Sequence, residues 1–391
     1  MTVGARVQAL LDEGVASGVF PSAAAVVLHE GRRVLAGAAG QATLGTFWDL
    51  ASLSKPLATT ALFMTLWRDG LVSPETPVAD LAPAAAVGRA GATLGDLLTH
   101  RAGLPAYSPL FAPVLRDRPA LLDPACPADV RSAARAETVA RALAVAPDAR
   151  LRARALYSDV GFIVLGELLA AGAGAWLDVA FVERVAAPLD VELRFRRLSS
   201  MPAAGTPDRS IAPTGRGRPR EPAPGQEGLW EPFPFHPSPA GEVDDDNAWA
   251  LDGVAGHAGL FGSVGDLARM GQALLDDWNG RGRLGPTAHW ARALARDGDT
   301  PGSTRAFGFD TRGPGDARPA GSAGSRIGDG LPGAVGHTGY TGTSLWIDLG
   351  RRLVVALCTN RTAGLEGRAN ARINEFRPRF HDAVVDALDR V

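Results

Sequence analysis

The chain reads Asp49-Leu50-Ala51-Ser52-Leu53-Ser54-Lys55-Pro56 just before an apolar, helix-compatible run that reaches Trp67. Lys55 is the only lysine, because every other residue among the 40 lysines and arginines is an arginine. A lysine can lose its proton when it is buried and then act as a base, whereas an arginine stays charged. The stretch therefore indicates a catalytic role for Lys55.

Ser52 precedes Lys55 by three residues, which places the two side chains one turn apart on the same face of a helix. The serine Oγ and the lysine Nζ can then come within hydrogen-bonding distance, as in an activated nucleophile. Asp49 is the expected N-cap, and Pro56 is tolerated only near the first turn. Ser52 would thus lie at a helix N-terminus, where free N–H groups favour a developing anion.

The composition is that of ordinary globular protein, with 391 residues, 46% hydrophobic and 21% charged. A net charge of -2 gives no electrostatic reason to expect nucleic acid or an anionic membrane as a partner. Cys126 and Cys358 lie outside any C-x-x-C pattern, and no H-E-x-x-H occurs. We expect two buried thiols, no metal and no cofactor.

The N-terminal segment lacks the features of a signal peptide, since Asp12 and Glu13 interrupt its apolar residues and no basic region precedes them. It is typical of an amphipathic helix. The longest apolar run, Val160 to Val182, contains Glu167 and Asp178, which favours a core helix or helix pair over a membrane span. These observations predict a soluble, cytoplasmic protein.

Strands are predicted near both ends of the chain, at residues 23–29, 33–38, 343–348 and 353–359. A first helix and a last helix, from Arg377 to Arg390, enclose them. Between them the sequence predicts helices at residues 94–100, 134–146, 160–171, 177–187 and 263–277.

This order predicts an α+β fold, in which an antiparallel sheet built from both chain ends is flanked by helices, with a helical lobe beside it. Residues 1–51 together with 253–391 would form the sheet domain, and residues 52–252 the mainly helical domain. Residues 201–247 are rich in Pro, Gly and charge and have no periodicity. Their aromatic residues, among them Trp230, Phe233 and Phe235, favour a loop that lines a cleft over a disordered linker.

Three motifs occur in order: Ser52-x-x-Lys55, Tyr157-x-Asp159 and His337-Thr338-Gly339. With them the chain resembles the serine β-lactamases and penicillin-binding proteins, especially the class C-like branch that includes serine carboxylesterases and D-amino-acid-specific peptidases. The resemblance covers nearly the whole chain. It implies a β-lactamase/DD-peptidase-like fold.

The resemblance also implies roles for individual residues. Ser52 would be the acylated nucleophile, and Lys55 would lower the pKa of Tyr157 so that a phenolate or a shared proton serves as base. Whether Lys55 or Tyr157 is the base at rest stays open. The backbone N–H groups of Ser52 and Tyr340 would form the oxyanion hole. Further candidates for substrate contact are Asp159, His337, Thr338, Gly339, Tyr107 and His257, although His257 and His100 are each more typical of structural histidines.

Two residues depart from the family pattern. Asp159 replaces an asparagine that can donate a hydrogen bond to a substrate carbonyl, and an ionised carboxylate can only accept. His337 replaces a lysine, and imidazole is mostly uncharged at neutral pH. These changes favour an esterase on esters of small acids. The alternatives are a β-lactamase, a D-alanyl-D-alanine carboxypeptidase or D-amino-acid peptidase, and a binding or sensing protein without turnover; the natural substrate and the oligomeric state stay open.

Overall fold

The computed structural model describes most of the chain, in seven stretches: residues 3–123, 125–152, 154–201, 210–215, 240–316, 323–363 and 370–390. Trp230, Phe233 and Phe235, and most of the predicted 201–247 loop, lie outside these residues. Trp249, just after that loop, is buried in the short helix α11 (Asp246–Ala250).

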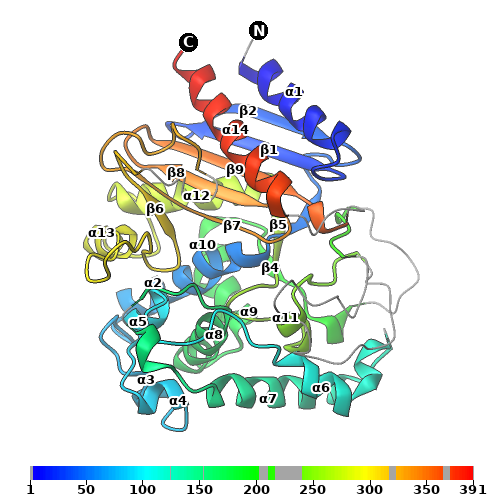
Figure 1. The fold of residues 1–391 in the computed structure, drawn as a ribbon, viewed down its shortest axis with the longest axis vertical. Helices are drawn as coiled ribbons and strands as arrows, with labels where there is room; N and C mark the ends of the chain where they lie inside the picture. Colours follow the sequence, from blue (N-terminus) through cyan, green and yellow to red (C-terminus); the bar gives the residue numbers. More distant parts are fainter. Residues whose placement is uncertain are drawn as a thin grey trace.

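A six-stranded antiparallel sheet forms the frame of the molecule (Figure 1). β1 lies between its sequence neighbour β2 and the distant β9, and Ala23 pairs with Thr359. The two chain ends therefore meet in one sheet, which confirms the predicted fold. In spatial order the strands are β2 (Arg32–Ala39), β1 (Ala23–His29), β9 (Leu353–Thr359), β8 (Ser344–Asp348), β7 (Ala334–Thr338) and β6 (Asp310–Arg312).

The alternation of side chains along β1 supplies two hydrophobic cores. One face packs against α1 (Val3–Ala16) and α14 (Asn370–Leu388), in a cluster that includes Val27. The other face, which includes Val26, packs against α12 (Val264–Trp278). α14 begins before the predicted Arg377, because its first two turns already place Ile373 and Phe376 in the core.

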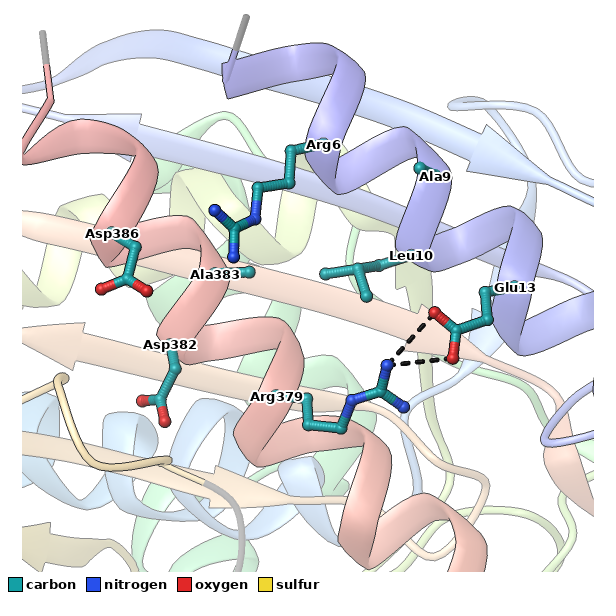
Figure 2. A pocket seen from close by; sticks show the side chains of 8 residues that line it. All are labelled: Arg6, Ala9, Leu10, Glu13, Arg379, Asp382, Ala383 and Asp386. Atoms are coloured by element: carbon teal, nitrogen blue, oxygen red, sulfur yellow. Dashed lines mark hydrogen bonds and ion pairs between the residues drawn. The ribbon is translucent and has the colours of Figure 1, made fainter. Parts of the chain in front are cut away.

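A groove of about 400 Å³ lies between α1 and α14 on the outer face of the sheet (Figure 2). Its sides are largely charged, and Arg379 of α14 donates to Glu13 of α1 at 2.9 Å. The groove is separated from the helical lobe by the sheet. Its lining residues are Arg6, Ala9, Leu10, Glu13, Arg379, Asp382, Ala383 and Asp386.

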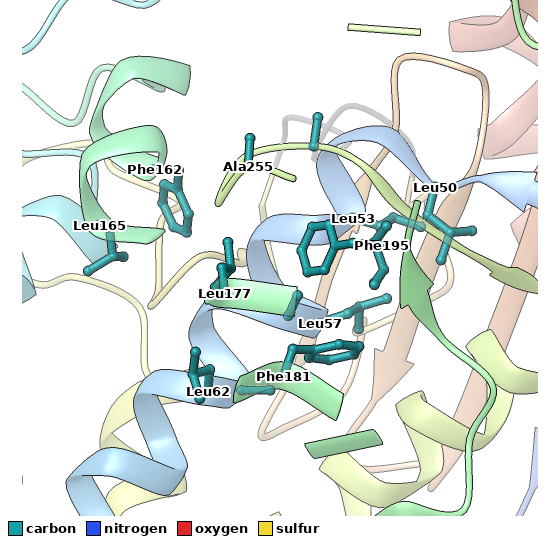
Figure 3. Packing of buried hydrophobic residues seen from close by; sticks show 14 of the residues in the cluster. Leu50, Leu53, Leu57, Leu62, Phe162, Leu165, Leu177, Phe181, Phe195 and Ala255 are labelled. Atoms are coloured by element: carbon teal, nitrogen blue, oxygen red, sulfur yellow. The ribbon is translucent and has the colours of Figure 1, made fainter. Parts of the chain in front are cut away.

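The helical lobe packs around α8 (Asp159–Ala173), of which ten residues are buried. α8 contacts α2 (Ala61–Arg68), α5 (Leu94–Leu98) and α7 (Ala128–Ala144), which starts six residues before its predicted position. Figure 3 shows part of the buried cluster in this lobe, with Phe162 and Leu165 from α8, Leu62 from α2, and Leu53 and Leu57 from the turns that precede α2. The remaining helices are α3 (Val78–Leu81), α4 (Ala86–Arg89), α6 (Phe111–Asp117), α9 (Leu177–Phe181), α10 (Ala187–Leu189) and α13 (Thr287–Leu294).

Within the described ranges, no single helix is both long and apolar enough to cross a membrane. The pair formed by α8 and Leu177–Leu189 reaches the required length and composition only across a bend of 73°. Cys126 and Cys358 are buried free thiols, as predicted.

A second, three-stranded sheet was not expected from the sequence, because its strands have only two to four residues. It consists of β3 (Phe47–Asp49), β5 (Leu260–Ser263) and β4 (Arg194–Phe195), with β5 in the centre. β3 ends at Asp49, directly before the Ser-x-x-Lys stretch. This small sheet thereby fixes the point at which the chain enters the candidate site.

Candidate active site

The chain turns sharply just before Ser52. Ala51 has a φ of +49°, a left-handed conformation that is costly for a residue with a Cβ. The Ala51 N–H donates to Asp49 Oδ1 at 2.8 Å, and the Asp244 N–H donates to Asp49 Oδ2 at 2.7 Å. Asp49 is therefore not the predicted N-cap. Its carboxylate holds the strained turn in place of capping a helix, and the residue at the cap position is Leu50.

Ser52 and Lys55 lie on two irregular turns that lead into α2. Ala51–Leu53 is a 3₁₀ turn, and Lys55–Thr60 is a π-helical turn, a local form that often marks functional sites. Lys55 Nζ donates to Ser52 Oγ at 3.0 Å, as the spacing of the two residues predicts. Ser52 is half-buried, whereas the Lys55 side chain is completely buried.

Lys55 is also held by partners from distant parts of the chain. Nζ donates to the His257 carbonyl oxygen at 3.1 Å and forms an ion pair with Asp159 Oδ1 at 2.7 Å. Burial, the strongest single influence, lowers the pKa of Lys55, but the negative charge of Asp159 and the contact with Tyr157 outweigh it. The pKa of Lys55 is therefore raised, and Lys55 is an ammonium at neutral pH. A buried lysine can lose its proton, but here the carboxylate of Asp159 keeps Lys55 protonated.

The N-cap of α8 positions Tyr157 and Asp159. Ser158 Oγ accepts a hydrogen bond from the Gly161 N–H at 3.1 Å, which fixes Ser158 as the cap. The residues on either side of the cap then face Lys55, whose Nζ lies 4.7 Å from the centre of the Tyr157 ring. Asp159, the first residue of α8, reaches Lys55 from this helix end.

The pKa of Tyr157 is raised overall, although Lys55 lowers it as the resemblance implies. Burial raises it most. The charge of Lys55 and hydrogen bonds with Lys55 and Ser52 do lower it, but the nearby carboxylate of Asp159 raises it again. At neutral pH the site thus contains an ammonium and a neutral phenol.

His337 lies on β7, with its ring 5.7 Å from the Tyr157 ring. Its Nδ1 is 2.8 Å from the carbonyl oxygen of Thr338, which can only accept, so Nδ1 carries the proton. Burial, followed by repulsion from Lys55 and Arg305, holds the pKa of His337 well below its usual value. This histidine is neutral at neutral pH and adds no fixed charge to the site.

The turn after β7 is docked against the strained turn at Ala51. Thr341 Oγ1 donates to the Asp49 carbonyl oxygen at 2.7 Å, and Thr343 Oγ1 donates to the Leu50 carbonyl oxygen at 3.1 Å. Gly339 leaves no space for a side chain, because a Cβ there would lie 2.6 Å from the Leu50 carbonyl oxygen. The turn is thus held close to the residues that precede Ser52.

Two backbone N–H groups at this junction are available for a ligand. In the part of the chain that the structure describes, neither the Ser52 N–H nor the Tyr340 N–H donates to a backbone or side-chain oxygen. The Tyr340 side chain is 45% exposed, and the Arg361 guanidinium lies 4.5 Å from the centre of its ring. The two N–H groups are those expected to bind an oxyanion.

The remaining histidines and the tyrosine considered in the sequence analysis lie around Lys55, Tyr157 and Asp159, and they differ in burial and in their partners. The ring of His257 is buried and contacts Asp245 Oδ1 at 2.8 Å, so it is the carbonyl of His257 that meets Lys55. His100 Nδ1 accepts from the Ser158 N–H at 3.0 Å, a structural role. Tyr107 is half-buried and follows Ala106, whose carbonyl accepts from the Asp159 N–H at 2.9 Å.

Sequence reasoning missed Arg305. Its guanidinium lies 5.0 Å from the centre of the Tyr157 ring and forms an ion pair with Asp310 at 2.8 Å. Asp310 begins the edge strand β6 and pairs with Gly336, the neighbour of His337. No motif distinguishes Arg305 from the other arginines in the sequence, so only the fold could identify it. The described residues contain no group of three or more His, Cys, Asp or Glu side chains that could hold a metal ion.

A serine hydroxyl within reach of a lysine and a tyrosine, beside a strand that carries His337-Thr338-Gly339, defines a class of protein: the serine hydrolases that use a Ser-x-x-Lys motif. In this class an oxygen nucleophile attacks a carbonyl, and backbone N–H groups stabilise the resulting oxyanion.

The chain belongs to the β-lactamase family, whose model, described as "Beta-lactamase", matches residues 7–377. A protein from Escherichia coli (strain K12) named "Putative D-alanyl-D-alanine carboxypeptidase" is 26% identical over 82% of this chain and 70% of its own length. An N-acetylmuramyl-L-alanine amidase from Bacillus subtilis (strain 168) is 25% identical over 98% of this chain and 88% of its own. The solved structure of EstCE1, a hydrolase with promiscuous acyltransferase activity, has a TM-score of 0.64 with 21% identity, covering 97% of both chains.

Proposed function

We propose that the protein is an esterase that cleaves esters of small carboxylic acids through an acyl-enzyme on Ser52. The observation that carries the proposal is the pairing of Lys55 with Asp159 at 2.7 Å, next to a neutral His337. Asp159 is thereby engaged by Lys55, and His337 offers no cation to a substrate carboxylate. A neutral ester of a small acid has no carboxylate that would need a cation at position 337, and it needs no hydrogen bond from position 159. EstCE1, which shares the fold, is a hydrolase with promiscuous acyltransferase activity, and such an activity is compatible with an acyl-enzyme route.

The first chemical step forms the acyl-enzyme. Ser52 Oγ attacks the ester carbonyl while its proton passes to the Lys55–Tyr157 pair, and the oxyanion is held by the N–H groups of Ser52 and Tyr340. When the tetrahedral intermediate collapses, the pair returns a proton to the departing alcohol. Water then attacks the acyl-Ser52 carbonyl while the pair takes a proton from that water. When the second tetrahedral intermediate collapses, the pair returns this proton to Ser52 Oγ, and the acid and free Ser52 are released.

The protonation state of Lys55 and Tyr157 in the free enzyme limits the attack by Ser52. Because the pKa values of Lys55 and Tyr157 are both raised, the pair must lose one proton before it can accept one from Ser52. The fraction of enzyme in that state grows as the pH rises. The rate is therefore expected to increase from neutral toward alkaline pH.

A second candidate function is a D-alanyl-D-alanine carboxypeptidase or a related peptidase on D-amino acids. It is favoured by the name of the Escherichia coli relative. It is also favoured by the guanidinium of Arg305, which is paired with Asp310 but lies next to Tyr157, since a peptide substrate of this kind has a terminal carboxylate. A β-lactam, which also carries a carboxylate, would fit the same site.

The test is steady-state hydrolysis of p-nitrophenyl butyrate by the wild type and by Ser52→Ala, with a chromogenic cephalosporin and D-alanyl-D-alanine as parallel substrates. We expect the ester to be the best substrate and the alanine variant to be inactive. Faster turnover of the dipeptide or the cephalosporin would replace the esterase assignment by the second candidate. Equal rates for Ser52→Ala and wild type would refute the acyl-enzyme on Ser52.

A further inference from the structure

Arg377 is a buried arginine behind the turn that carries Tyr340. It lies on α14, its side chain is only 4% exposed, and its guanidinium donates to three backbone carbonyls of this turn. The acceptors are the carbonyl oxygens of Gly339 at 2.7 Å, Thr343 at 2.9 Å and Gly342 at 3.3 Å. A planar guanidinium with five fixed donors suits such a convergent set, which an ammonium could satisfy only in part.

The shortest of these hydrogen bonds, from Arg377 to the Gly339 carbonyl oxygen, acts on the peptide unit between Gly339 and Tyr340. The Gly339 carbonyl and the Tyr340 N–H belong to the same peptide, which is trans. In a planar trans peptide the C=O and the N–H point in opposite directions. Arg377 therefore holds the carbonyl end of the peptide whose N–H end faces the position expected for the oxyanion.

The charge of Arg377 stands without a carboxylate partner among the residues that the structure describes, since its hydrogen bonds all go to backbone carbonyls. Burial, followed by repulsion from Arg361, lowers the pKa of Arg377 to about 9, which leaves it charged at neutral pH. A cation at the carbonyl oxygen withdraws electrons from the peptide and makes its N–H a stronger donor. The same bonds also fix the orientation of the turn.

We infer that Arg377 is a positioning residue for the oxyanion hole, which acts through the Gly339–Tyr340 peptide to orient and strengthen the Tyr340 N–H. The inference rests on the proposed acyl-enzyme mechanism and adds a residue that does not touch the substrate. It predicts a loss of transition-state stabilisation with little change in substrate binding. The hydroxyls of Thr341 and Thr343 hold the same turn through bonds to the carbonyl oxygens of Asp49 and Leu50.

The experiment compares Arg377→Met and Arg377→Lys with the wild type on p-nitrophenyl butyrate. Rates are expressed per active site, counted by labelling with a fluorophosphonate, so that a misfolded fraction does not lower the result. We expect kcat of Arg377→Met to fall by about 10- to 100-fold with KM changed by less than about threefold. Arg377→Lys should recover part of the loss, because it keeps the charge but fewer of the hydrogen bonds.

A second readout is inhibition by phenylboronic acid, which forms a tetrahedral anionic adduct on a serine. Its inhibition constant should rise in Arg377→Met by the same factor as kcat falls. The matched control is Arg379→Met on the same helix, which removes the surface pair with Glu13 and should leave both quantities unchanged (Figure 2).

The outcomes separate two failures. If the wild type turns over the ester and Ser52→Ala does not, but Arg377→Met keeps kcat and boronate affinity per active site, the inference about Arg377 is wrong and the mechanism stands. The inference is also wrong if KM rises as much as kcat falls. If Ser52→Ala is as active as the wild type, the proposed function fails and the inference fails with it.

Discussion

At the scale of single residues, the central feature is the charge of Asp159. A neutral asparagine at this position would leave the Lys55 cation to act on Tyr157 alone, whereas the carboxylate, 2.7 Å from Lys55 Nζ, opposes that effect. The sequence identified Ser52, Lys55, Tyr157 and Asp159 because they belong to motifs. It could not reveal the Lys55–Asp159 pair or its effect on pKa values, since these depend on contacts between segments about 100 residues apart.

Asp159→Asn should move the pH dependence of the reaction. The negative charge of Asp159 raises the pKa values of both Lys55 and Tyr157, so its removal lowers both. The rise of kcat/KM with pH should then shift to lower pH by about one unit or more. The profile is measured with p-nitrophenyl butyrate between pH 6 and 10. Asp178→Asn, which removes a carboxylate paired with Arg197, serves as control and should not shift the profile.

His100 and His337 should make the fold sensitive to mild acid. Burial is the main cause that holds both pKa values well below 6.5 in the folded protein. As the pH falls below about 6.5 the unfolded chain binds these protons first, so stability that is present at higher pH is lost, by about 1.4 kcal/mol per pH unit for each histidine.

Urea unfolding between pH 7.5 and 5 tests this expectation. His100→Asn is the matched variant, because asparagine tolerates the φ of +60° at this position and can still accept from the Ser158 N–H, but does not titrate. Its stability should fall less steeply with pH. An identical slope in wild type and variant would show that His100 does not contribute.

At the scale of elements, the site depends on the docking of one turn against another. Strands β1, β8 and β9 were predicted almost to the residue, because each is a continuous apolar run bounded by turn residues. The contact between residues 339–343 and 49–51 was not predicted. It consists of threonine hydroxyls bonded to backbone carbonyls, a pairing for which the sequence contains no periodic signal.

Gly339→Ala should disrupt this docking. The added Cβ would meet the Leu50 carbonyl oxygen and the Thr343 side chain, so the turn must move away from Ser52. A displacement of this kind is expected to lower kcat by about 100-fold. Gly298→Ala, where a Cβ meets nothing within 4 Å, is the control and should keep full activity. Normal kcat in Gly339→Ala would mean that the turn does not need this close contact.

At the scale of the whole molecule, α14 stabilises the sheet from its outer face. Phe380 of this helix is completely buried, in the cluster that also contains Val27 and Trp346. The α+β class and the meeting of the chain ends could be predicted, because strand patterns occur at both ends. The small sheet of β3, β4 and β5 could not be predicted, because two to four residues are too few to show a pattern.

Phe380→Ala should destabilise the protein by about 3–5 kcal/mol, the usual loss for a large aromatic side chain in a core. Urea unfolding followed by tryptophan fluorescence measures it. Val34→Ala on β2 is the control, since Val34 is 40% exposed and its loss should have little effect. A change in Phe380→Ala no larger than in the control would indicate that α14 contributes little to the stability of the sheet.

The position of β1 between β2 and β9 also has a consequence for biosynthesis. β1 leaves the ribosome well before its partner β9, which is encoded more than 300 residues later. At usual elongation rates of roughly 5–20 residues per second, one edge of β1 waits about 15 to 65 seconds for its partner. Ser52 and Lys55 are made early in that interval, and the turn that carries Tyr340 is made near its end. A nascent chain therefore contains Ser52 and Lys55 for most of that interval before the turn that would complete the proposed oxyanion hole has been made.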